Sequence, residues 1–163
     1  MNRVDWIRIV LVLHVLGAIA GLGTNLTFGL IMAIGERTGG QARVFAIRTI
    51  QTLDRRLANP AYMAQLATGL VLVWLLKLDL FGTSWLLLGI ALYAAVAVLG
   101  ITVYGPVLRK QAALAEHLAT DDGVGAVTSE YREIAHRSKM LGVLATVTVV
   151  VIVALMVTQP QLW

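Results

Sequence analysis

The residue best able to do chemistry inside a membrane is His14, which lies in the apolar stretch 6–34. Ionisable groups in such a stretch are costly, so each one is a functional suspect by default. On a helix, Gly17, Gly21 and Asn25 share the face of His14. Two interpretations of this face stay open: the glycines let another helix approach closely, or they leave room for a flat macrocycle that His14 ligates.

Depth in the membrane suggests the neighbours of His14. At 1.5 Å per residue, His14 lies ~12 Å inside the tryptophan that precedes it, and Tyr93 is expected equally deep. Gln65 and Thr68 fall near the same level and complete a polar layer without a carboxylate. The layer therefore disfavours a carboxylate ion site, and its neutral histidine is either a haem ligand or a satisfied structural residue.

Other candidate ligands are weaker. Met156 and Tyr93 are conceivable as a second iron ligand, and copper would suit a histidine with methionines, but one histidine makes a poor copper site. His117 and His136 lie among charges, which is typical of a solvated helix surface, with pH sensing or haem transfer as the alternative. The chain has no phosphate loop, nucleophile elbow, metalloprotease helix or dinucleotide fingerprint, so no catalytic residue is assigned.

Composition sets the class of protein. The 163 residues are 58% hydrophobic and 13% charged, whereas soluble domains are about 25% charged. The net charge of +4 comes from basic residues beside apolar stretches, a pattern that reports membrane topology and not nucleic-acid binding. The absence of cysteine excludes disulfides, thiolate metal sites and c-type haem attachment.

Four apolar stretches are long enough for a helix to cross the bilayer. Because every backbone amide in lipid must be paired internally, the expected fold is all-α: a single four-helix transmembrane bundle with cytoplasmic helical extensions. The expected spans cover about 6–34, 60–80, 85–105 and 140–158, and an interfacial amphipathic helix is expected at about 41–58.

Element boundaries follow from capping residues and breakers. Asn59-Pro60 is expected to start the second span. The third span is expected to continue past Gly105-Pro106 as a polar helix as far as Asp121-Asp122-Gly123. Thr128 or Ser129 is expected to cap the last helix.

Charge distribution predicts orientation. The segments after spans one and three carry the basic residues Arg37, Arg43, Arg48, Arg55, Arg56, Arg109, Lys110, Arg132, Arg137 and Lys139. The opposite side has only Arg3, Arg8 and Lys77. The positive-inside rule therefore predicts cytoplasmic loops and external termini. Tryptophans prefer interfaces, and Trp6, Trp74, Trp85 and Trp163 all fall at the expected external ends.

Several short motifs together carry a resemblance. They are Leu13-His14-Val15-Leu16-Gly17-Ala18, Thr68-Gly69, Gly105-Pro106, Ser129-Glu130-Tyr131-Arg132, and Leu155-Met156-Val157 shortly before Pro160. With these motifs, nearly the whole chain resembles a bacterial family of predicted four-span membrane proteins of unknown function. That family is distantly similar to the protoporphyrinogen-oxidase-type membrane proteins, which bind haem b, and to the copper-resistance D-type membrane domain.

The resemblance implies a role for one residue only. Both distant relatives place a histidine early in the first span, which makes His14 a candidate ligand of haem b. The oxidase-type enzymes also use a lysine within a membrane helix, whereas Lys77 is expected at the outer edge of the second span. This departure argues against porphyrinogen oxidation.

Three hypotheses follow. The first is a non-enzymatic module that binds one haem b through His14, lined by Gly17, Gly21, Thr68 and Tyr93, for electron transfer or haem handling. The second is an accessory subunit without a cofactor that packs on a membrane partner, or on a second copy, through the Gly17/Gly21 face. The third is a membrane oxidase acting on a porphyrin-like substrate.

Overall fold

The structure, a computed structural model, describes residues 2–120 and 127–160, and within these residues every regular element is a helix. The α-helices are α1 (Arg3–Thr38), α2 (Gly40–Leu53), α3 (Asn59–Leu76), α4 (Ser84–Leu99), α5 (Gly105–Thr120) and α6 (Ser129–Thr158). Two π-helical turns, η1 (Asp54–Ala58) and η2 (Gly100–Tyr104), join α2 to α3 and α4 to α5. The expected all-α class is therefore confirmed.

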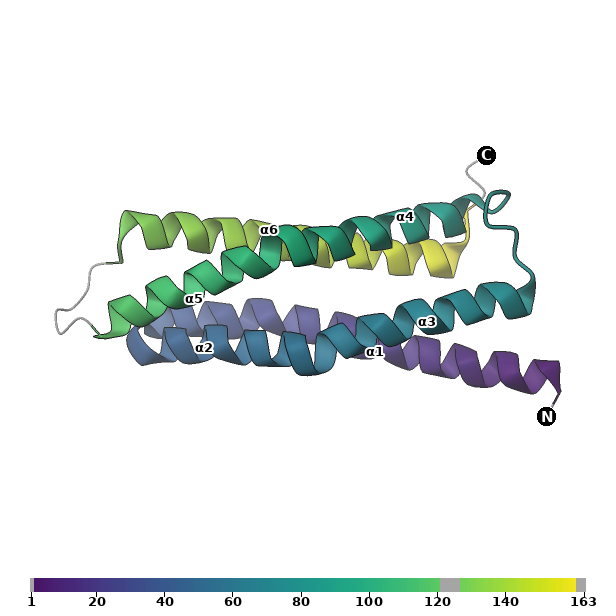
Figure 1. Cartoon of the computed structure of the whole chain (residues 1–163), viewed down its shortest axis with the longest axis horizontal. Coiled ribbons are helices and arrows are strands. Elements are labelled where there is room, and N and C mark those ends of the chain that lie inside the picture. The colour runs from purple at the N-terminus through teal and green to yellow at the C-terminus, as the bar shows by residue number, and fades with distance from the viewer. Residues whose placement is uncertain (1, 121–126, 161–163) are drawn as a thin grey trace.

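The helices form four nearly parallel rods (Figure 1). Each rod is long and apolar enough to cross a membrane: α1, the continuous helix Gly40–Leu76, the continuous helix Ser84–Thr120, and α6. The first turn of α1 and the last turn of α6 lie at the same end of the molecule, which we call the terminal end, and the other end is the loop end (Figure 1). The expected helix end at 121–123 and Trp163 lie outside the described residues.

The two prolines that follow the π-helical turns explain why the rods are continuous. Asn59-Pro60 was expected to start a helix, but the helix runs through it from α2 into α3. A proline inside an α-helix lacks an N–H and clashes with the carbonyl four residues earlier. Widening of the turn before Pro60 relieves this conflict, and η2 lies in the same way before Pro106. A proline thus shifts the helix geometry here without ending the helix.

Capping residues mark the remaining boundaries. Gly39 and Gly40 have φ angles of +73° and +48°, which L side chains rarely adopt, and they turn the chain from α1 into α2. Thr128 Oγ1 accepts a hydrogen bond from the Tyr131 backbone N–H at 3.2 Å, so Thr128 is the N-cap of α6, one of the two caps predicted for that helix.

The hydrophobic core lies in the loop-end half of the bundle. It consists of Phe28, Ile47, Ile50, Ala58, Leu108, Ala112, Ala115 and Tyr131. Phe28 belongs to the segment 6–34 that was expected to cross the bilayer, so the far part of that span also serves a protein core. The helix expected at 41–58 runs alongside α1 as α2 and continues through η1 into α3, because Ile47 and Ile50 are buried in this core (Figure 1).

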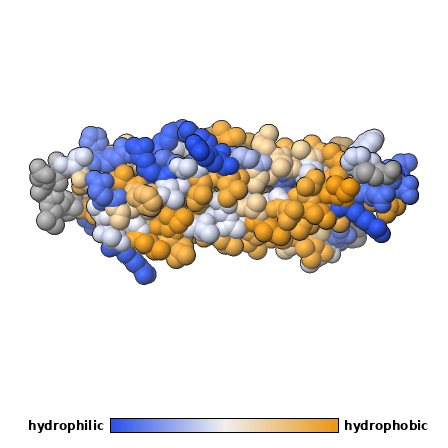
Figure 2. Space-filling view, turned by 90° about the horizontal axis from the view of Figure 1, so that it is seen from below, coloured by the Kyte–Doolittle hydropathy of each residue, from blue (hydrophilic) through white to orange (hydrophobic). Residues whose placement is uncertain are grey.

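The terminal-end half has little core of its own. Within the most apolar windows of the four rods, only 17%, 6%, 11% and 0% of the residues are buried inside the chain, in chain order. An apolar band covers the middle of the molecule, with hydrophilic residues gathered towards both ends (Figure 2). These surfaces have the length and composition of bilayer-crossing segments.

Candidate functional site

A polar seam between α1 and α3 contains His14. The Nδ1 atom of His14 lies 3.0 Å from Thr68 Oγ1, and its Nε2 atom lies 2.9 Å from Gln65 Nε2. Two of the neighbours suggested by depth, Gln65 and Thr68, therefore do meet the histidine. Both ring nitrogens have partners, and the side chain is half-buried between the two helices.

The donors in this seam select one tautomer of the imidazole. Gln65 Nε2 can only donate, so His14 Nε2 is the acceptor. Thr68 Oγ1 lies 2.7 Å from the Ala64 carbonyl and donates to it, which leaves an oxygen lone pair for the Nδ1–H of His14. The histidine is neutral in this arrangement, with its Nε2 lone pair directed at Gln65.

Glycines bring the two helices together. A Cβ atom at Gly17 would lie 2.8 Å from Gln65 Oε1, and one at Gly21 would lie 2.8 Å from the Tyr62 ring. A Cβ atom at Gly69 would lie 3.1 Å from His14 Cε1. Of the two interpretations of the glycine face, close helix approach therefore describes this structure, and the approaching helix is α3 of the same chain.

The hydroxyl of Tyr93 makes its hydrogen bond to a group other than His14. It donates to the backbone carbonyl of Tyr62 at 2.7 Å. Tyr62 in turn donates to the Gly21 carbonyl at 3.2 Å and accepts a hydrogen bond from Asn25. Tyr93 thus joins α4 to α3 through the Tyr62 backbone carbonyl, and its hydroxyl does not take part in the hydrogen bonds of His14.

One atom of the seam, His14 Nε2, has the chemistry of an iron ligand. Histidines that ligate metals commonly donate their second N–H to a fixed acceptor, as His14 donates to Thr68. The competing group on Nε2 is held weakly, because Gln65 Oε1 is buried without a hydrogen-bond partner. Rotation of the Gln65 side chain would expose the Nε2 lone pair and release that unpaired oxygen, so the donor chemistry suits one axial bond.

In the described part of the chain, the hydrogen-bond partners of His14 are Gln65 and Thr68, neither of which is a usual iron ligand. Among the described residues, no group of three or more His, Asp or Glu side chains is placed to hold a metal ion. Met156 packs on α4, since a Cβ atom at Gly89 would lie 2.9 Å from its Cε. His117 and His136 are exposed on the loop-end helices, and Lys77 is an exposed C-cap of α3 at the terminal end.

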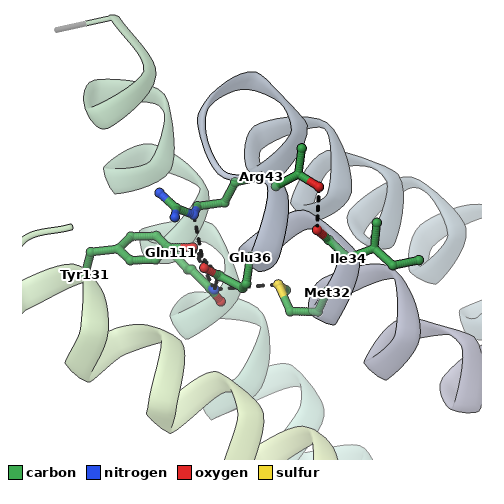
Figure 3. A network of polar contacts seen from close by, with 7 residues as sticks. Met32, Ile34, Glu36, Arg43, Gln111 and Tyr131 are labelled. Carbon is green, nitrogen blue, oxygen red and sulfur yellow. Dashed lines mark hydrogen bonds and ion pairs between the residues drawn. The ribbon is translucent and has the colours of Figure 1, made fainter. Parts of the chain in front are cut away.

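A second polar cluster lies at the loop end, where sequence reasoning assigned only solvated charges. Glu36 Oε2 accepts from Arg43 Nε at 3.0 Å, and Glu36 Oε1 accepts from Tyr131 Oη and from Gln111 Nε2, the latter at 3.3 Å (Figure 3). The Arg43 guanidinium lies 5.0 Å from the centroid of the Tyr131 ring. We call these four residues the Glu36 cluster. It joins α1, α2, α5 and α6 around one carboxylate.

A sequence signal for this cluster exists but is weak. Gln111 and Tyr131 are buried at 1% exposure, although each directly follows a charged residue, Lys110 and Glu130 respectively. Their burial depends on which faces of α5 and α6 meet α1. A single sequence does not state that pairing.

The comparisons with known proteins are consistent with the fold. No curated protein and no solved structure matches the chain. One family model does, over residues 8–160, and it is described as predicted integral membrane protein (DUF2269). Because the match spans nearly all of the chain and the structure has four helices able to cross a membrane, the protein belongs to this family of predicted integral membrane proteins.

Proposed function

We propose that the protein is a small, non-enzymatic membrane module that binds one b-type haem through Nε2 of His14. The observation that carries the proposal is the hydrogen bond from Nδ1 of His14 to Thr68 at 3.0 Å, which orients a neutral imidazole within an apolar segment. When bound, the haem would supply one-electron transfer. The other residues of this chain orient the imidazole and keep water away from it.

Each neighbouring residue has a distinct part. Thr68 holds the tautomer that leaves the Nε2 lone pair free to bind iron. Gln65 occupies that lone pair in the structure and turns away on binding. Gly17 and Gly69 set the distance between α1 and α3, so that Thr68 reaches the ring. The residues that would hold the haem are therefore those that reach His14 Nε2 from outside the Gly17/Gly21 face, because α3 fills the space beside these glycines.

We also propose the orientation of the module. The loop-end extensions carry most of the basic residues, which supports a cytoplasmic loop end and external termini in a bacterial plasma membrane. A protease added to intact cells should then spare the loop-end helices, and cleavage there without lysis would reverse the orientation.

The proposal is tested by absorption spectra of the detergent-purified protein from haem-supplied cells, oxidised and then reduced with dithionite. The wild type should show a Soret band that His14→Ala removes. Gln65→Ala should retain the band and bind haem more tightly, because it removes the group that competes for Nε2. His136→Ala is the matched control and should leave the band unchanged, since this histidine is exposed at the loop end.

Two results would overturn the proposal: a colourless wild-type protein, or a Soret band that survives His14→Ala. In either case His14 is a packing residue of the α1/α3 seam. The function to test next is then the accessory-subunit hypothesis. Its partner surface would have to be other than the Gly17/Gly21 face, because Gln65 and Tyr62 of the same chain cover that face.

A further inference from the structure

Five exposed basic residues lie towards the loop end, each next to the apolar part of one of the rods. Arg55 and Arg56 lie in η1, directly before the apolar helix α3. Arg109 follows the apolar helix α4 by one turn beyond η2, and Arg137 and Lys139 precede the apolar part of α6. All five side chains are exposed, and we call them the interface belt.

Packing brings Arg109, Arg137 and Lys139 to one level of the bundle. The hydrogen bond from Gln51 Nε2 to the Leu108 carbonyl, 3.5 Å long, holds the helix that leads into Arg55 and Arg56 beside the helix of Arg109. Arg109 folds back along its helix, and its Nη1 would lie 3.5 Å from a Cβ atom at Gly105. Tyr104, the residue before Gly105, reaches α6, where its hydroxyl would lie 4.0 Å from a Cβ atom at Gly142. The antiparallel pairing of these helices therefore sets Arg109 close in height to Arg137 and Lys139.

The charge of the interface belt is largely uncompensated. Within the described part of the chain, the ion pairs join Arg43 to Glu36, Arg48 to Glu116 and Lys110 to Glu130, and none includes a belt residue. Two carboxylates lie near. Asp54 is half-buried and accepts from Asn59 Nδ2 at 3.3 Å, and Glu133 precedes Arg137 by one helical turn. The local balance stays positive.

Apolar side chains border the interface belt on its membrane side. Ile101 is 78% exposed and lies about two helical turns before Arg109, and Met140 and Val143 follow Lys139 at 49% and 51% exposure. A ligand with an anionic head group and hydrocarbon chains fits these two adjoining surfaces. Its head group contacts the basic side chains of the interface belt, and its chains cover the neighbouring apolar residues. Free phosphate would use only the first of these surfaces.

We propose that the interface belt is a binding surface for anionic phospholipids, so that the protein retains phosphatidylglycerol-type lipids in preference to zwitterionic ones. The terminal end lacks this feature. There Arg3 Nε donates to the Leu75 carbonyl at 3.1 Å, and Arg8 and Lys77 are accompanied by Asp5 and Asp79. The preference is thus a property of the loop-end leaflet.

The test titrates the detergent-purified full chain with short-chain phosphatidylglycerol, phosphatidylcholine or inorganic phosphate, and counts bound molecules by native mass spectrometry. Phosphatidylglycerol should bind most tightly, with inorganic phosphate and phosphatidylcholine weaker. The variant Arg55→Gln/Arg56→Gln should lose about fivefold in phosphatidylglycerol affinity per charge removed, hence roughly 25-fold in all. High salt should reduce the preference, because exposed charges are screened.

The matched control is Arg8→Gln/Lys77→Gln, which removes the same charge from the terminal end. It should keep the phosphatidylglycerol affinity of the wild type, and unchanged thermal melting of both double variants would show that the fold is intact. Equal loss in the control, or no loss in Arg55→Gln/Arg56→Gln, would overturn the proposal. So would equal binding of phosphatidylglycerol and phosphatidylcholine by the wild type.

Discussion

Replacement of Glu36 by glutamine tests whether the Glu36 cluster holds the loop-end core together. The change keeps the size of the side chain but removes its charge, and it leaves the Arg43 guanidinium, whose side chain is 10% exposed, without a counter-ion. One amide oxygen can still accept from Gln111 or Tyr131. The new amide N–H groups, however, face the donor of Arg43.

The size of the effect follows from burial. Removal of one partner of a fully buried ion pair costs about 3–5 kcal/mol. The Glu36 side chain is 31% exposed, so water screens part of the interaction, and we expect a loss of about 2–3 kcal/mol. For a protein of this length, that corresponds to a decrease of roughly 5–10 °C in melting temperature.

The assay is helix content against temperature in mild detergent, at one fixed scan rate. Glu116→Gln is the matched control, since it breaks the Arg48–Glu116 pair, whose side chains are 63% and 39% exposed. Such surface pairs are worth at most about 1 kcal/mol, so the control should melt close to the wild type. Proteolysis should also reach α2 sooner in Glu36→Gln, because α2 is held partly through Arg43.

A double variant separates charge pairing from shape. Combining Glu36→Gln with Arg43→Met removes the unpaired cation, so it should be more stable than the two single effects predict, by about 1–3 kcal/mol. Our reasoning would be refuted if Glu36→Gln melted like the Glu116→Gln control. Strict additivity in the double variant would likewise show that the carboxylate and guanidinium do not stabilise one another.

Two further predictions concern single backbone positions and use the same melting assay. Gly35→Ala should destabilise by about 1–3 kcal/mol, because its Cβ would collide with Ala46 and lie 3.3 Å from the Ala42 carbonyl oxygen. Gly29→Ala, whose Cβ meets nothing within 4 Å, should be neutral or stabilising by up to about 1 kcal/mol, and equal effects would contradict this packing. Lys77→Gly should raise stability by about 1 kcal/mol, because Lys77 has a φ angle of +54° that glycine adopts without strain. A lower melting temperature for Lys77→Gly would show that its side chain, and not its backbone, matters.

The sequence alone determined the class of fold and much of the candidate site. Apolar stretches near the length of a bilayer leave helices as the only way to pair the backbone, so four membrane-crossing helices were readable without a structure. The 3.6-residue period placed Gly17 and Gly21 on the face of His14, and counting residues from the tryptophans brought Gln65 and Thr68 to its level. These inferences rest on periodicity and length, which are local properties of the chain.

Depth counting was less reliable where helices tilt or widen. Tyr93 was expected in the layer of His14, but its hydroxyl bonds to the Tyr62 carbonyl and not to the histidine, because residue counts from an interface ignore how each helix is rotated and shifted along its axis. Asn59-Pro60 was expected to start a helix, whereas the π-helical turn η1 lets the helix continue. A proline signals local strain, and the surrounding packing selects how that strain is relieved.

Only the tertiary structure determined which faces of the helices are buried in the protein. It placed the core at the loop end, where Phe28 of a bilayer-length apolar segment packs with residues of the amphipathic helices α2 and α5. It also gathered Glu36, Arg43, Gln111 and Tyr131, which are separated by up to 95 residues, around one carboxylate. Such clusters depend on the relative rotation and register of helices that are far apart in the chain. Those quantities are set by the sum of many side-chain contacts between the helices, and no local pattern of residues encodes them.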